Sequence, residues 1–299
     1  MLRWRLVVAA ILIIPLLTLI WIDDQANAGR PGIWLGPVAL IIGVMACHEV
    51  NAIFRYGKFS VSATPNLLAS FSVLAFSLVP LLWSQYPIDC PLGKPGWTLI
   101  GMAVAIALIF SCELVRFRQP GESLSRLATG IFAATYTGLL MSFLIQIRYL
   151  HSNRVGLIAL VATILIVKLS DTGAYFVGRS MGRHKLAPHL SPGKTIEGLM
   201  GGIGAAMLGG WAVHSLILPN LAGETQTGSL GWFMLYAVTL CLAGVLGDLA
   251  ESMLKREVGQ KDSSNWLPGM GGVLDLTDSM LSTAPVSFAW WASGMLILA

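Results

Sequence analysis

Residues 155–178 read VGLIALVATILIVKLSDTGAYFVG, and this stretch decides the fold class. A helix needs about 20 predominantly apolar residues to cross the hydrocarbon core of a bilayer, and this stretch is long enough. Strands are disfavoured in it, because an open sheet edge in lipid leaves backbone groups without hydrogen-bond partners. The stretch therefore predicts a transmembrane helix.

The same apolar pattern recurs along the chain. Hydrophobic residues make up 55% of the sequence and charged residues only 11%, whereas soluble domains carry about 25% charged residues. We predict an all-α, polytopic bundle of about nine membrane helices. The second segment is short for a membrane span, so it could be tilted or re-entrant, or its boundaries could be assigned wrongly. The expected segments are Arg5–Ile22, Ile33–Ala46, Leu67–Trp83, Trp97–Cys112, Leu127–Ile147, Val155–Gly178, Gly198–Leu218, Leu230–Leu249 and Met280–Ala299.

The basic residues predict the orientation of these helices. Of the 19 Lys and Arg residues, 14 lie on the side of the N-terminus, four lie on the other side and Lys168 lies within a helix. By the positive-inside rule this favours N-in, C-out, in a bacterial-type cytoplasmic membrane with the active face cytoplasmic. A cleavable signal peptide ending near Ala26-Asn27-Ala28 is the alternative for the first segment only.

The chain divides into two parts by the polarity of its loops. Residues 1–150 have short, bland loops and are expected to form a scaffold that could carry a groove for lipid. Residues 151–299 are expected to be the catalytic region, because two cytoplasmic loops at 179–197 and 250–279 are rich in Gly, Pro and charged residues. The net charge of +4 favours anionic lipid or phosphate partners, and no nucleic-acid motif is present.

Two polar groups lie in and after the sixth segment. Lys168 and Asp171 share a helix face, and ionisable residues in lipid usually pair and mark a site, although a structural ion pair is the alternative. Basic residues then precede a helix expected to begin near Thr195, with Glu197 in its first turn. A helix N-terminus beside Lys194 suits an anion, while an ordinary positive-inside loop is the alternative.

The strongest polar group follows residue 247. Asp248, Ser252 and Lys255 recur at helical spacing, so they share a face, and Asp275 and Asp278 share another. Carboxylates near Lys and Arg suit Mg²⁺ that is bound jointly with substrate phosphates. The glycines between the two groups permit a tight turn and close approach of the backbone. Solvated charges at the end of a helix are the alternative.

These residues resemble the phosphatidate cytidylyltransferase (CDP-diglyceride synthetase) family. Its signature S-x-x-K-R-x4-K-D is similar to Ser252, Lys255, Arg256, Lys261 and Asp262 here. The Asp171-Thr-Gly-Ala-Tyr175 stretch, Gly178-Arg179 and the segment Ser191–Gly198 resemble other blocks of that family. Three departures from the family pattern are Gly193 for a Lys, Met270 for a His and Leu276 for an Arg.

The resemblance implies that a lipid phosphate attacks the α-phosphorus of CTP, giving a CDP-lipid and pyrophosphate. Phosphatidic acid is the first choice of acceptor, and Mg²⁺ is expected at two divalent or mixed cation sites, with Asp248, Asp275 and Asp278 as ligands. A homodimer is among the options for assembly. The catalytic residues are expected to be Asp248, Ser252, Lys255, Arg256, Asp275 and Asp278; the substrate-binding residues, Asp171, Tyr175, Arg179, Lys194, Thr195, Glu197, Lys261 and Asp262.

Three other functions stay open at this point. A related cytidylyltransferase would use the same site for an ether-lipid or polyprenyl phosphate. A transporter would also carry Lys168 and Asp171 within the membrane. An inactive paralogue acting as a scaffold would account for Met270 and Leu276.

Overall fold

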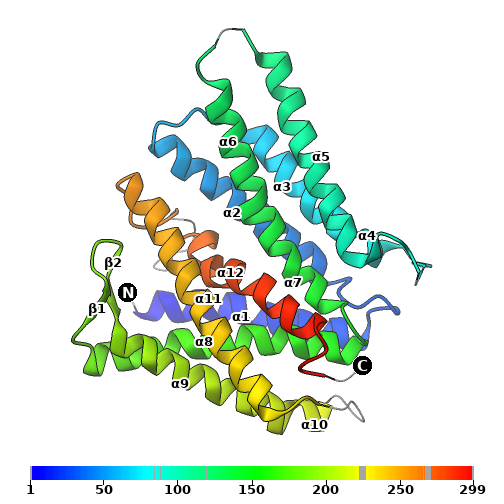
Figure 1. Cartoon of the computed structure of the whole chain (residues 1–299), viewed down its shortest axis with the longest axis vertical. Helices are drawn as coiled ribbons and strands as arrows, with labels where there is room; N and C mark the ends of the chain where they lie inside the picture. Colours follow the sequence, from blue (N-terminus) through cyan, green and yellow to red (C-terminus); the bar gives the residue numbers. More distant parts are fainter. Residues whose placement is uncertain are drawn as a thin grey trace. The chain divides into compact units, whose positions relative to one another are not determined.

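The computed structural model describes residues 2–297 except 84, 88, 119, 222–226, 265 and 267–270, and for residues 2–9 it describes the backbone only (Figure 1). The described chain is built almost entirely of helices. They are α1 (Leu2–Gln25), α2 (Leu35–Tyr56), α3 (Ala63–Ser77), α4 (Val79–Leu82), α5 (Gly93–Arg116), α6 (Ser123–Ala133), the π-helical turn η1 (Ala134–Leu139), α7 (Leu140–Arg148), α8 (Asn153–Met181), α9 (Ile196–Ala212), the π-helical turn η2 (Val213–Ile217), α10 (Leu218–Leu221), α11 (Leu230–Glu257) and α12 (Val273–Ala292).

The predicted fold class, an all-α polytopic membrane protein, is confirmed. Among the described residues, six helical stretches are long and apolar enough to cross a membrane: Leu35–Tyr56, Gly93–Arg116, Ser123–Arg148, Asn153–Met181, Ile196–Leu221 and Leu230–Glu257. The short helix α3 is apolar too. The count of nine membrane helices and the N-in orientation stay predictions.

The chain folds as two compact units. Unit 1 comprises Met1–Gln146 and Leu254–Thr277, and unit 2 comprises Ile147–Met253 and Asp278–Ala299. Helices α11 and α12 therefore each contribute residues to both units. The functional division predicted for residues 1–150 and 151–299 stays a prediction.

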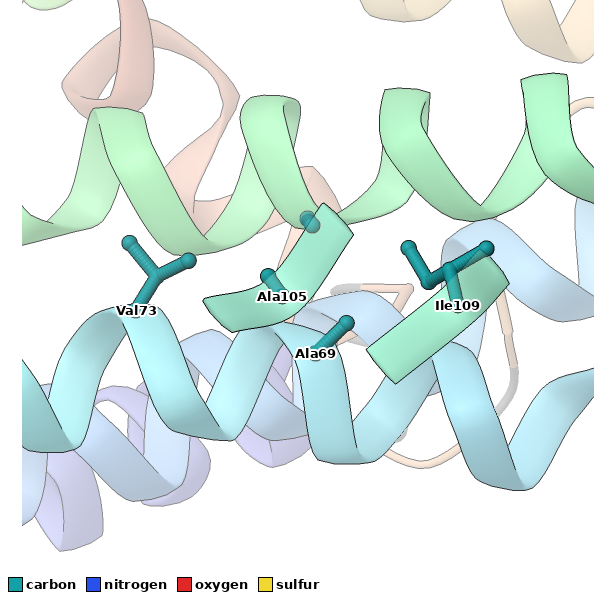
Figure 2. Close-up of a cluster of buried hydrophobic side chains, with 5 residues drawn as sticks. Ala69, Val73, Ala105 and Ile109 are labelled. Atoms are coloured by element: carbon teal, nitrogen blue, oxygen red, sulfur yellow. The ribbon is translucent and has the colours of Figure 1, made fainter. Parts of the chain in front are cut away.

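The core of unit 1 is centred on the short helix α3. It packs against α2, α5, α6 and η1. Small and branched side chains from three of these elements meet in a fully buried cluster (Figure 2). The cluster consists of Ala69, Val73, Ala105, Ile109 and Ala134. Small residues let helices approach closely where lipid supplies no hydrophobic driving force between them.

Helices α8 and α9 of unit 2 lie side by side along much of their length (Figure 1). Gly173 of α8 faces Gly201 and Ala205 of α9 so closely that a Cβ on Gly173 would collide with both. This tight pairing brings the end of α8 next to the beginning of α9, where several predicted site residues lie.

The expectation of a short second segment, Ile33–Ala46, is wrong, because α2 continues to Tyr56. The residues that seemed to end the span are polar but buried: Glu49 is 1% exposed and Asn51 is 0% exposed. Asn51 accepts a hydrogen bond from Asn66 at 2.6 Å. Polar side chains that find partners inside the protein can continue a membrane helix, so polarity did not mark its end.

The two expected loops are also more ordered than predicted. Residues 179–197 include an antiparallel hairpin of β1 (Lys185–Ala187) and β2 (Ser191–Thr195). The argument against strands applies to sheet edges in lipid, and this hairpin links the ends of two membrane helices. In the second region α11 runs to Glu257 and α12 begins at Val273, so only 258–272 connect helices.

Candidate active site

The hairpin of unit 2 is fixed to the first turn of α9. Thr195 is the N-cap of α9, and its Oγ1 accepts a hydrogen bond from the Gly198 amide at 3.1 Å. The Glu197 carboxylate accepts from the amides of Arg183 and His184 at 3.0 and 3.1 Å, and lies 2.5 Å from His184 Nδ1. The predicted start of this helix is therefore confirmed. The Glu197 carboxylate anchors the hairpin, and its role in substrate binding stays a prediction.

The polar face of α8 carries two pairs of predicted residues. Lys168 Nζ lies 3.4 Å from Asp171 Oδ2, which confirms the expected pairing. One turn further on, Arg179 donates to the Tyr175 hydroxyl at 2.5 Å, and its guanidinium carbon lies 5.9 Å from the centre of the same ring. All four side chains lie on the stretch of α8 that packs against α9.

A second ion pair joins the hairpin to α11. Lys194 Nζ lies 2.7 Å from Asp248 Oδ2, and Ser252 Oγ donates to Asp248 Oδ1 at 3.4 Å. Asp171 interacts electrostatically with both Lys194 and Asp248. Asp278, which is 8% exposed, interacts electrostatically with Asp248 as well. Unit 2 thus brings predicted residues from α8, β2, α11 and α12 into one charged neighbourhood.

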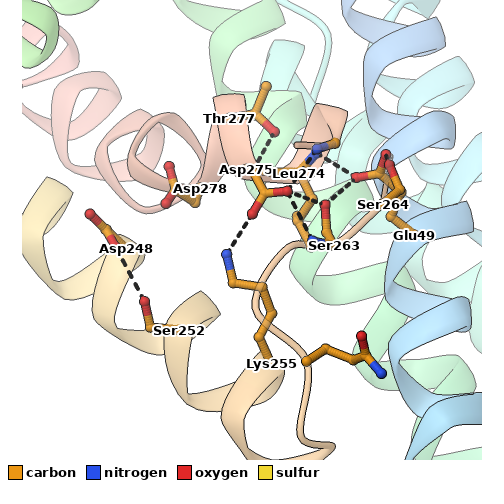
Figure 3. Close-up of polar contacts among 12 residues, drawn as sticks. Glu49, Asp248, Ser252, Lys255, Ser263, Ser264, Leu274, Asp275, Thr277 and Asp278 are labelled. Carbon is orange, nitrogen blue, oxygen red and sulfur yellow. Dashed lines mark hydrogen bonds and ion pairs between the residues drawn. The ribbon is translucent and has the colours of Figure 1, made fainter. Parts of the chain in front are cut away.

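Unit 1 holds the rest of the predicted signature. Lys255 Nζ lies 2.5 Å from Asp275 Oδ1, and the two side chains are only 10% and 12% exposed. The other oxygen of Asp275 accepts from the Ser263 amide at 2.9 Å, the Ser263 hydroxyl at 2.6 Å and the Gly272 amide at 2.7 Å (Figure 3). Asp275 is therefore fully engaged within the connection between α11 and α12.

The remaining signature residues of unit 1 lie nearer the solvent. Arg256 donates to the Gln260 carbonyl, which lies just beyond the end of α11, at 3.1 Å. Lys261 and Asp262 are exposed. Their expected contacts with substrate stay predictions.

The turn before α12 needs glycine for two different reasons. Gly271 has a φ of +88°, a backbone region that side chains disfavour. A Cβ on Gly272 would collide with Ser263 Oγ and with the Glu49 carboxylate. The predicted tight turn with close backbone approach is confirmed at these two glycines. Met270, the departure at the adjacent position, lies outside the described residues.

Sequence reasoning missed Glu49 of α2. Its carboxylate accepts hydrogen bonds from Ser263, Ser264 and the first two amides of α12 (Figure 3). The available signal was an acidic residue close behind an apolar run, which in a membrane helix points to a functional contact. Ending the predicted segment at Ala46 hid that signal, because Glu49 then appeared to lie in a loop.

The carboxylates differ in how well they suit a divalent cation. Within neither unit, over the described residues, do three or more His, Cys, Asp or Glu side chains gather closely enough to hold a metal ion. Asp248 and Asp278 provide the oxygen donors that Mg²⁺ prefers, which it usually completes with water and substrate phosphates. Asp275 fits less well as it stands, because four protein contacts already fill its two oxygens, whereas each oxygen of Asp248 has one.

Comparison with known proteins places these motifs in a family. The sequence pattern of the cytidylyltransferase family matches residues 3–293. The chain belongs to the cytidylyltransferase family. This confirms the resemblance found in the motifs, extends it to the helices before residue 150 and disfavours a transporter.

Three bacterial relatives, each named phosphatidate cytidylyltransferase, illustrate the similarity. The Bacillus subtilis protein is 32% identical over 251 residues, which is 83% of this chain and 86% of the relative. The Haemophilus influenzae protein is 42% identical over 139 residues, 46% of each chain. The Brucella suis protein is 35% identical over 186 residues, 62% of this chain and 64% of the relative.

Proposed function

We propose that this chain transfers the cytidylyl group of CTP to phosphatidic acid in the membrane, giving CDP-diacylglycerol and pyrophosphate for phospholipid biosynthesis. Family membership and the names of the relatives support the reaction. One structural observation carries the proposal for the site. Lys194 and Lys255, the lysines expected to bind phosphate, each pair with a carboxylate expected to bind metal, Asp248 and Asp275 respectively.

Each of these pairs, taken by itself, suits the binding of a phosphate group. Phosphoryl transfer requires little covalent chemistry from a protein, and depends on positioning and on neutralising charge. The acceptor phosphate is ionised near neutral pH, so the reaction needs no general base. Each lysine is held in place by its carboxylate before CTP arrives, and its ammonium group can then turn to a phosphate oxygen.

In this proposal Asp248 and Asp278 would hold Mg²⁺, while Asp275, whose oxygens contact Lys255, Ser263 and Gly272, holds Lys255 in place. A bound Mg²⁺ would neutralise the phosphate oxygens of CTP. Ser252 holds the orientation of Asp248 through its hydroxyl. Tyr175 and Arg179 present a further cationic group on α8 for phosphate.

Among the three departures from the family pattern, Gly193 is the one whose surroundings we describe. A Cβ at Gly193 would meet no atom within 4 Å, so the space for a longer side chain is open. The missing lysine therefore removes a charge without disturbing the hairpin, and Lys194 remains beside it.

The acceptor is tested with purified protein, CTP labelled in its cytosine ring and a panel of lipids in detergent. The panel contains phosphatidic acid, an ether analogue of it, a polyprenyl phosphate and diacylglycerol, which lacks the phosphate. Label should enter lipid with phosphatidic acid and Mg²⁺, stop with chelator, and never enter diacylglycerol. Faster labelling of the polyprenyl phosphate or the ether analogue would assign another acceptor, and no labelling of any lipid phosphate would contradict the proposal.

A further inference from the structure

Glu49 belongs to α2, far in sequence from the signature, yet the residue is only 1% exposed and its carboxylate makes four hydrogen bonds to that region. Its Oε1 accepts from Ser264 Oγ at 2.7 Å and from the Val273 amide at 3.0 Å. Its Oε2 accepts from Ser263 Oγ and from the Leu274 amide, both at 2.8 Å. All these residues lie in unit 1.

We propose that Glu49 is a positioning residue for cytidylyl transfer, fixing Ser263 and the first turn of α12 so that Asp275 holds Lys255 in place. This inference rests on the proposed function. Glu49 acts through other residues, and no contact between its carboxylate and a substrate is part of the proposal.

A continuous set of short contacts links Glu49 to the signature lysine. The hydroxyl of Ser263 lies between two carboxylates, 2.8 Å from Glu49 Oε2 and 2.6 Å from Asp275 Oδ2. The other oxygen of Asp275 contacts Lys255 Nζ. Glu49 therefore sets the position of Ser263, Ser263 sets the position of Asp275, and Asp275 sets that of Lys255.

The contacts join the middle of the connection between α11 and α12 to the start of α12. Ser263 and Ser264 lie in its first half, and Val273 and Leu274 begin the next helix. The first amides of a helix have no partner within the helix, and a carboxylate there satisfies them and interacts favourably with the helix dipole. In α12 that carboxylate comes from a different helix, so Glu49 ties α2 to Ser263, Ser264 and the start of α12.

The hydrogen-bond pattern requires a carboxylate and excludes an amide. Each oxygen of Glu49 accepts one backbone N–H, and a backbone N–H cannot turn round to accept a hydrogen bond. Glu49→Gln would set an NH₂ group against the amide of Val273 or of Leu274, whichever way the side chain turned. The substitution keeps the size of the side chain and breaks one of the contacts that fix α12.

Asp23 provides a control with the same chemistry. It is 0% exposed, lies in unit 1 and accepts hydrogen bonds from the amides of Gly32 and Trp34 at 3.0 and 3.1 Å. Asp23→Asn therefore makes the same change from carboxylate to amide at an equally buried turn, away from the signature. A loss of activity that comes only from a weakened fold should appear in both variants.

The experiment compares both variants with the parent full-length protein in detergent, by hydrogen–deuterium exchange and by steady-state kinetics with CTP and phosphatidic acid. Glu49→Gln should speed exchange in peptides covering 262–276. It should lower kcat/KM for CTP per folded molecule by about tenfold to a hundredfold. This loss is typical of substitutions at residues that orient the side chains of a site without contacting the bound group themselves. Asp23→Asn should speed exchange only near residues 27–34 and keep kcat/KM within about twofold of the parent value.

Two results would overturn the inference. Unchanged exchange over 262–276 in Glu49→Gln would show that Glu49 does not fix this segment. Faster exchange there with kcat/KM at the parent value would show that the contact is structural only. If the parent protein itself makes no CDP-lipid, the proposed function fails, while the exchange measurement still reports on the segment by itself.

Discussion

At the residue scale, the two lysine–carboxylate pairs differ in burial. The side chains of Lys255 and Asp275 are 10% and 12% exposed, and those of Lys194 and Asp248 are 22% and 38% exposed. The buried pair is surrounded by protein donors, whereas the second pair is half-buried and has fewer protein contacts. The first is expected to contribute to stability as well as activity, and the second mainly to activity.

Asparagine substitutions separate these two roles. Asp275→Asn leaves the buried Lys255 without its counter-charge and sets an amide against donors, so it should lower the free energy of unfolding by about 1–3 kcal/mol. Asp248→Asn removes a half-buried partner with fewer protein contacts and should lower it by less, about 1 kcal/mol at most. Both should nearly abolish formation of CDP-lipid. The measurements are denaturant unfolding in detergent and turnover; equal destabilisation, or parental turnover in both, would contradict this account.

Alanine substitutions test the lysines themselves. Lys194→Ala and Lys255→Ala should each lower kcat/KM for CTP about tenfold to a hundredfold, since a charge-assisted hydrogen bond to phosphate contributes roughly 1.5–3 kcal/mol. Lys58→Ala is the matched control, because Lys58 is an exposed lysine outside both pairs. If all three variants use CTP equally well, Lys194 and Lys255 serve only to orient the chain in the membrane.

Side-chain chemistry could be predicted at this scale better than side-chain partners. Asp248, Ser252 and Lys255 follow one another at helical spacing, and the structure confirms that one helix carries them. The partner of Lys255 lies across a loop at Asp275, and Glu49 reaches the same loop from another helix. Such partners depend on how helices pack, which the spacing of residues along one helix does not encode.

At the scale of elements, the hairpin and α9 form a compact motif that holds Lys194. The Thr195 side chain caps α9, and Glu197 ties the preceding turn to the same helix. The beginning of α9 could be predicted, because Thr is a favoured N-cap residue and an acidic residue such as Glu197 is favourable in the first turn of a helix. The hairpin could not, since its short strands carry no alternating apolar pattern and fold between two helices that are packed together.

The cap itself can be tested by stability. Thr195→Ala removes the acceptor for the Gly198 amide and should lower the free energy of unfolding by about 1 kcal/mol, as is typical of N-cap residues. Thr195→Ser keeps the hydroxyl and should stay close to the parent. Denaturant unfolding in detergent measures both. A Thr195→Ala variant as stable as Thr195→Ser would show that the cap does not stabilise α9.

At the scale of the whole molecule, orientation in the membrane is the main prediction still to be tested. The charge distribution places the hairpin and the connection between α11 and α12 on the cytoplasmic side. Lys185→Cys and Asp262→Cys, made in a Cys90→Ser background, should therefore not react with an impermeant thiol reagent added to intact cells. They should react once the membrane is permeabilised.

The parent chain supplies a control for this experiment. Cys90 is half-buried and lies between α4 and α5, in a segment predicted to face outward. It should react in intact cells, which shows that the reagent reaches outer loops. Labelling of Lys185→Cys or Asp262→Cys from outside would reverse the orientation and remove the site from the side where CTP is available.

The reaction itself is the central claim, and the position of a radioactive phosphorus tests it most directly. Purified protein is given phosphatidic acid and Mg²⁺ with CTP labelled either at the α- or at the γ-phosphorus. Attack at the α-phosphorus transfers the α label into lipid and releases the γ label as pyrophosphate, and this is the result we predict. Entry of the γ label into lipid, or of neither label, would contradict cytidylyl transfer by this chain.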